Sequence, residues 1–147
     1  MKHRVVVIDG MGGGIGVQLI GKLKDLGDRD LEIIALGANS TATERMIKAG
    51  AHRGATGENA LKVTVKTGDF ILGPIGIVIA HSLMGEISPG MAEAILSAPG
   101  ERILLPLQNE HFLLAGPEAL PLARQVDRAV ELYRERIRAV KDALAAN

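Results

Sequence analysis

Residues 4–16 read RVVVIDGMGGGIG, and this stretch decides the fold class of the chain. The run 4–9 is continuously apolar and rich in β-branched residues, as a parallel strand covered on both faces requires. Five of the seven residues that follow are glycines. Ile15, Leu19 and Leu23 then recur at helical spacing. A strand, a glycine loop and an amphipathic helix in this order are typical of the first βα turn of a doubly wound fold.

The rest of the chain extends this alternation of strands and helices. Strands are predicted over residues 31–37, 51–56, 70–73, 77–80 and 102–107, and helices over 41–49, 57–67, 88–97 and from Leu120 to the end. Residues 57–67 alternate like a strand, but a parallel strand at Phe70 needs a crossover, which favours a helix there. Thr41 and Glu44 have the spacing of a capping box. The pattern predicts an α/β chain with a mostly parallel sheet.

We expect a single Rossmann-like, three-layer domain, because 147 residues suit one ordinary core. Residues 1–116 are expected to form the nucleotide-binding-type unit. Residues 117–147 are expected to be a long amphipathic helix that packs on the same domain or on a partner subunit. Its apolar stripe comprises Val126, Val130, Tyr133, Ile137, Val140 and Leu144.

Composition excludes several classes of protein. The 17 basic and 17 acidic residues balance, which argues against a nucleic-acid partner, because a polyanion normally requires a net basic face. The chain has no cysteine, which excludes disulfide scaffolds and thiolate chemistry. The longest nearly apolar run, 70–80, is too short to span a bilayer, and the first residues lack the pattern of a secretory signal. We therefore expect a cytoplasmic protein without a membrane partner.

The glycine loop is the candidate ligand site. Glycines let a phosphate approach the backbone, and the amides and dipole at a helix N-terminus favour an anion. The predicted cofactor-binding residues of the loop are Gly10, Met11, Gly12, Gly13, Gly14, Ile15 and Gly16. A nucleotide or another phosphate ligand is the favoured interpretation. A tight turn that binds nothing, or a different ligand, remains the alternative.

The loop spacing Gly-x-x-x-Gly-Ile-Gly, from Gly10 to Gly16, resembles that of short-chain dehydrogenases. Those enzymes pair a tyrosine with a lysine four positions later. Tyr133 is instead followed at that spacing by Ile137, so their catalytic apparatus is missing. No Lys-Ser or Lys-Thr closes the glycine run, which excludes a Walker phosphate loop. The sequence therefore predicts a sensor or an enzyme of unknown reaction.

The segment after the second strand bears on the choice of nucleotide. A dinucleotide site usually has an acid there to hold the ribose hydroxyls, but this chain has Asn39, Ser40 and Thr41, with Arg45 one turn into the helix. These groups suit a 2′-phosphate, so we expect NADP rather than NAD. Alternatively, Ser40 and Thr41 only cap the helix and Arg45 is a solvated surface residue.

Further polar or turn residues follow the predicted strands at the edge where ligands bind. Gly73 and Pro74 join the predicted site, and Asp9 is interpreted as a cap for the amides of Gly12 to Gly14. The loop 52–59 is a plausible second ligand wall. The roles of six residues stay open: Asp9, His52, Arg53, Glu58, His81 and His111.

Two alternatives to nucleotide binding stay open. The first is a non-enzymatic assembly protein, in which residues 70–84 and the C-terminal stripe form a homo-oligomer interface. A homo-oligomer is also expected if a ligand binds. The second is metal handling through His52, His81 and His111. Because no two histidines have ligand spacing, a metal is expected to be absent.

Four segments together resemble a small bacterial family, domain of unknown function 3842. They read VIDGMGGGIG (7–16), IIALGAN (33–39), KAGAHRGATGENA (48–60) and GPIGI (73–77). The resemblance covers residues 4 to about 107 and leaves the C-terminal helix outside. It implies no activity. It does imply that loop 52–59 and turn 73–76 belong to the same unit as the glycine loop, so we expect them to converge on one site.

Overall fold

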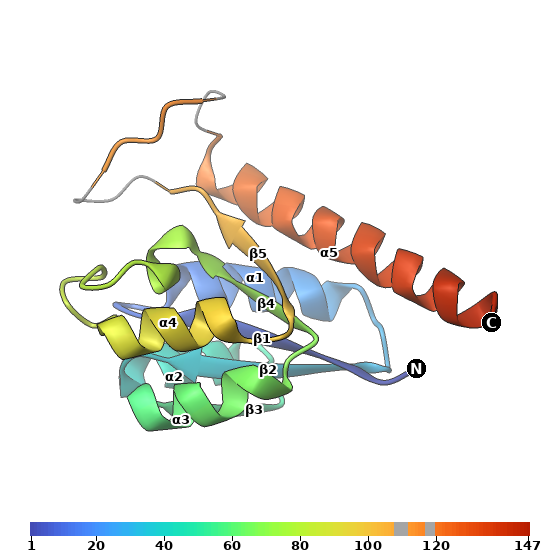
Figure 1. The fold of residues 1–147 in the computed structure, drawn as a ribbon, viewed down its shortest axis with the longest axis horizontal. Coiled ribbons are helices and arrows are strands. Elements are labelled where there is room, and N and C mark those ends of the chain that lie inside the picture. Colours follow the sequence, from blue (N-terminus) through green and yellow to red (C-terminus); the bar gives the residue numbers. More distant parts are fainter. Residues whose placement is uncertain (108–111, 117–119) are drawn as a thin grey trace.

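The computed structural model describes residues 1–107, 112–116 and 120–147, and it contains one parallel sheet in that part of the chain (Figure 1). The sheet has five strands in the order β3-β2-β1-β4-β5, and every neighbouring pair is parallel. The strands are β1 (His3–Asp9), β2 (Leu31–Gly37), β3 (Arg53–Thr56), β4 (Phe70–Pro74) and β5 (Glu101–Leu105). The predicted α/β fold with a parallel sheet is confirmed.

Helices make the crossovers between the strands. They are α1 (Gly14–Asp25), α2 (Ser40–Lys48), α3 (Glu58–Thr64), α4 (Pro89–Ser97) and the long α5 (Leu122–Ala145), with short 3-10 helices η1 (Val65–Thr67) and η2 (Ile75–Val78). The helix expected over 57–67 is confirmed, because α3 and η1 carry the chain between two parallel strands. None of the helices in the described ranges is both long and apolar enough to cross a membrane.

The sheet is covered on both faces, which makes the domain three-layered. Val5 and Val7 of β1 pack in one core with residues of α1, α2 and α5, whereas Val6 and Ile8 pack in a second core with residues of α3 and α4. All four side chains are fully buried. Burial on both faces explains why β1 is continuously apolar rather than alternating.

Helix α5 packs on α1 and β5 of its own chain (Figure 1). The first four residues of its apolar stripe, from Val126 to Ile137, are buried, whereas Val140 and Leu144 are 42% and 57% exposed. Strand β4, the first part of the 70–84 segment, is also buried in the sheet. Most of the apolar surface invoked for a homo-oligomer interface therefore belongs to the chain's own core.

Three expectations about single elements are wrong. Residues 77–80 form no strand; β4 ends at Pro74, which lacks an N–H for the sheet, and the chain winds into η2 with Ile77 buried under α4. Thr41 and Glu44 form no capping box, because the side chain of Asn39 accepts from the amide of Ala42 at 2.9 Å and starts α2 one residue earlier. The fifth strand spans 101–105 rather than 102–107.

Candidate functional site

The carboxyl ends of β1 and β4 mark a topological switch point. From β1 the chain crosses through α1 to β2 on one side, and from β4 it crosses through α4 to β5 on the other side. In open parallel sheets, ligands bind beyond the carboxyl ends of the strands at such a switch point. The glycine loop directly follows β1 and lies at this position.

The glycines of the loop divide into structural and accessible ones. Gly13 has a φ of +75°, and a Cβ there would lie 2.9 Å from the backbone of Ala42. Gly16 is buried against Met46 and has no room for a side chain. Gly12 and Gly14, in contrast, are exposed at the start of α1. The loop therefore presents open backbone at a helix N-terminus.

Asp9 closes the inner side of the glycine loop. Its side chain is 3% exposed and accepts hydrogen bonds from the amides of Gly10 and Gly16, both at 2.8 Å. Burial raises the pKa of Asp9 above its ordinary value, and the nearby Glu86 carboxylate acts in the same direction. Asp9 does cap the loop, but it binds Gly10 and Gly16 rather than the expected amides of Gly12 to Gly14.

Helix α2 braces the glycine loop from the side. The Nδ2 group of Asn39 donates to the carbonyl oxygen of Met11 at 2.8 Å, and Arg45 donates from Nη1 to the carbonyl oxygen of Gly12. Ser40 and Thr41 are exposed in the first turn of α2. Of the four polar residues predicted after the second strand, the structure brings Asn39 and Arg45 into contact with the loop.

Glu86 contacts the glycine loop although the sequence did not place it in the predicted site. It belongs to the turn segment 79–88, which connects η2 to α4 and lies against the glycine loop. Its Oε1 accepts from the amide of Met11 at 2.5 Å, and its Oε2 accepts from Nδ2 of Asn39 at 2.7 Å. The only local signal was a carboxylate in a histidine-containing loop, because Glu86 follows β4 by twelve residues and no spacing rule reaches that far.

The backbone is strained on both sides of this contact. Within the described residues, the non-glycine residues with positive φ are Met11 (51°), His81 (70°), Leu83 (55°) and Met84 (55°). Three of them lie in the segment that carries Glu86, and the fourth donates its amide to Glu86. Such conformations cost of order 1–3 kcal/mol each and cluster at ligand sites. The strain therefore converges on the meeting point of the two loops.

Other predicted residues do not line this site. Gly73 and Pro74 are buried in β4, where a Cβ on Gly73 would clash with the carbonyl oxygen of Ile8. His52 and Arg53 lie at the amino end of the sheet, on the opposite edge from the glycine loop: His52 accepts from the amide of Ile33, and Arg53 pairs with a partly buried glutamate of β2. Residues 52–59 therefore do not form one ligand wall, because strand β3 (Arg53–Thr56) separates the two ends of this segment.

The remaining titratable candidates are scattered. Glu58 pairs with Lys62 at 2.8 Å and accepts from the Ser88 hydroxyl, and the lysine and serine together lower its pKa. His81 lies in the strained turn segment, and His111 falls outside the described residues. In residues 1–107, 112–116 and 120–147, no three His, Asp or Glu side chains are grouped as a metal site requires.

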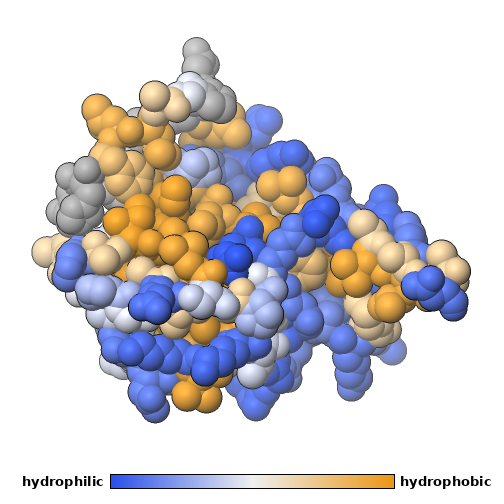
Figure 2. Space-filling view, viewed as in Figure 1, coloured by the Kyte–Doolittle hydropathy of each residue, from blue (hydrophilic) through white to orange (hydrophobic). Residues whose placement is uncertain are grey.

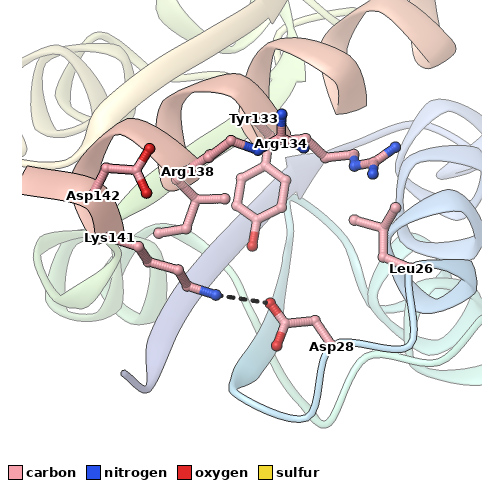
Figure 3. A pocket seen from close by; sticks show the side chains of 8 residues that line it. Leu26, Asp28, Tyr133, Arg134, Arg138, Lys141 and Asp142 are labelled. Carbon is pink, nitrogen blue, oxygen red and sulfur yellow. Dashed lines mark ion pairs between the residues drawn. The ribbon is translucent and has the colours of Figure 1, made fainter. Parts of the chain in front are cut away.

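A separate hollow lies between α5 and the turn after α1, at the amino end of the sheet (Figure 3). It has a volume of about 300 Å³. Tyr133 lies at its base, and Lys141 and Asp28 face each other across it at 3.8 Å. The cationic side chains of Arg134 and Arg138 also line it. This hollow contains none of the residues that the sequence singled out as a ligand site.

We compared the chain with models of known protein families. One family model matches residues 4–138. It therefore includes most of α5, which the sequence resemblance had left outside, and it confirms the resemblance itself. No curated protein matches the chain. The chain belongs to the family described as Domain of unknown function (DUF3842).

Proposed function

We propose that this protein binds a nucleotide or dinucleotide at the glycine loop. The observation that carries the proposal is the position of exposed Gly12 and Gly14 at the N-terminus of α1, beside the β1/β4 switch point. A tight turn that binds nothing would not need open backbone there. The sensor role and the enzymatic role are both compatible with this site.

The charges of Asp9 and Arg45 favour one orientation of the bound nucleotide. Asp9 already occupies the amides of Gly10 and Gly16, so a phosphate has to lie toward Gly12 and Gly14. Arg45 contacts the carbonyl oxygen of Gly12 and supplies the cation on that side. The phosphate end of the ligand therefore lies near Arg45, and the nucleoside end lies away from it.

A thermal shift titration with ATP, NAD⁺, NADP⁺ and FAD tests the proposal. A ligand at 100 times its Kd stabilises the folded chain by about 2.7 kcal/mol, which corresponds to a Tm increase of roughly 5–11 °C for a chain of this size. The variant Gly14→Val tests the site, because a Cβ at Gly14 meets nothing within 4 Å and the added side chain projects where the ligand would approach.

Gly21→Val is the matched control for Gly14→Val. Gly21 lies in the same helix, and a Cβ there also meets nothing within 4 Å. We expect the control to keep the thermal shift and Gly14→Val to lose it while remaining folded. A wild-type chain that shows no shift with any of the four nucleotides, or a Gly14→Val variant that keeps the full shift, contradicts the proposal.

A further inference from the structure

We propose that Glu86 recognises the ribose of the bound nucleotide and selects ligands with free 2′- and 3′-hydroxyls over 2′-phosphorylated ones. This inference rests on the proposed function and names the class of ligand. It reverses the preference for NADP that the sequence suggested, because that preference rested on the lack of a carboxylate after the second strand. In the folded chain, the distant segment 79–88 supplies a carboxylate, that of Glu86.

Glu86 lies where the nucleoside end of the ligand is expected. Its carboxylate is held between the amide of Met11, in the loop after β1, and the side chain of Asn39, directly after β2. In doubly wound folds, the ribose lies between the glycine loop and the end of the second strand. Asn39 occupies the position along the chain where such folds usually carry the acid, and it holds Glu86 there instead.

The carboxylate retains the capacity to bind a diol. An ionised carboxylate has about four acceptor sites. Met11 and Asn39 occupy one site on each oxygen, at 2.5 and 2.7 Å. One acceptor site therefore remains on Oε1 and one on Oε2, which is the number that two neighbouring hydroxyls require.

Charge disfavours a phosphate on the 2′-oxygen. Asp9 adds a second carboxyl group on this side of the loop, and although burial is the main cause of its raised pKa, the charge of Glu86 acts on it in the same direction. The guanidinium of Arg45 is engaged at Gly12, on the phosphate side of the loop. A 2′-phosphate at Glu86 would therefore meet like charge, whereas an unsubstituted ribose donates two hydrogen bonds.

Titration calorimetry with two matched ligand pairs tests the inference. NAD⁺ and NADP⁺ differ only in the 2′-phosphate, and ATP and 2′-deoxy-ATP differ only in the 2′-hydroxyl. We expect the wild-type chain to prefer the member with the free hydroxyl by about 10- to 100-fold, the range for a hydrogen bond to a charged group. Glu86→Gln should reduce both ratios to within about threefold, since the amide has lost the charge and one acceptor.

Two further variants separate recognition from a structural role. Glu93→Gln neutralises an exposed glutamate on α4 and should leave both ratios unchanged. Glu86→Asp keeps the charge and should still reject NADP⁺, even where overall affinity falls. Because the readout is a ratio of affinities, a general weakening of the site does not imitate the expected result.

The possible failures are distinguishable. If no nucleotide binds the wild-type chain, the proposed function and this inference both fall. If nucleotides bind and Gly14→Val abolishes binding, but NADP⁺ is preferred or Glu86→Gln leaves the ratios unchanged, the inference alone is overturned.

Discussion

Replacing Tyr133 by phenylalanine tests the account of how α5 is held to the sheet. The Tyr133 hydroxyl and Nε2 of His3 are 2.5 Å apart, and the two residues are separated by 130 positions in the sequence. Nδ1 of His3 lies 3.2 Å from the carbonyl oxygen of Met1. Since a carbonyl only accepts, Nδ1 carries the proton, and in the neutral imidazole Nε2 accepts from the Tyr133 hydroxyl.

The expected magnitude follows from what Tyr133→Phe removes. The ring stays packed edge-on against Phe70, at a centroid distance of 5.2 Å, so little apolar burial is lost. The substitution removes one hydrogen bond and leaves Nε2 of His3, a residue only 4% exposed, without its donor. Such a change costs about 1–3 kcal/mol of unfolding free energy, or roughly 2–12 °C in Tm.

Urea unfolding followed by circular dichroism measures this loss, and a double-mutant cycle assigns it. In a His3→Leu background the Tyr133 hydroxyl has lost its acceptor, so Tyr133→Phe should then cost little or be stabilising. A Tyr133→Phe variant within about 0.5 kcal/mol of wild type, the error of such comparisons, would refute the reasoning. An equal loss in both backgrounds would also refute it.

Three further predictions concern the sheet and its carboxyl edge. Gly73→Ala should destabilise the chain by about 1–3 kcal/mol, because its Cβ would meet a backbone carbonyl of β1. Gly21→Ala, where a Cβ meets nothing, should instead stabilise the chain by about 0.5–1 kcal/mol. Equal effects of the two substitutions in urea unfolding would contradict this expectation. Asn39→Ala should lower stability by about 1 kcal/mol through loss of the α2 cap, and an unchanged Tm would argue against that cap. Burial raises the pKa of Asp9, so this carboxyl ionises at lower pH in the unfolded chain than in the folded chain. The contribution of Asp9 to stability therefore falls as the pH rises from about 4 through the raised pKa of the folded chain. The stability of wild type relative to Asp9→Asn should therefore decrease over that interval in pH-stepped denaturation, and an increase would contradict the assignment.

Several large apolar side chains of the described residues lie outside the core, on different elements. Leu113 is 82% exposed and Met84 is 78% exposed. Figure 2 shows apolar surface beside the 112–116 segment, on the same side of the molecule as the 79–88 turn. The alternative of an assembly protein would have to use exposed apolar surface of this kind, rather than the buried strand β4 and the four buried residues of the α5 stripe that the sequence suggested.

Several features of the fold could be predicted from the sequence because they depend on local periodicity. The continuous apolar run in β1, the helical spacing in α1 and the glycine loop between them are set by residues within a few positions of one another. Even the helix at α3 could be predicted, although its alternation suggested a strand, because two parallel strands need a crossover. These features also located the candidate loop.

Only the tertiary structure decided which residues complete the site. The order β3-β2-β1-β4-β5 brings segment 79–88 onto the glycine loop and sends His52 and Arg53 to the opposite edge. Spacing in the sequence predicts neither position. Strand β3 has only four residues, yet it carries the chain from one edge of the sheet to the other and so separates His52 from the residues that follow Thr56. Periodicity indicates which face of an element is buried, whereas Glu86 and Met11 are 75 positions apart in the sequence and meet only in the folded chain. The sequence by itself determined that a glycine loop opens a parallel α/β sheet, and the packing of distant segments determined the charge beside that loop.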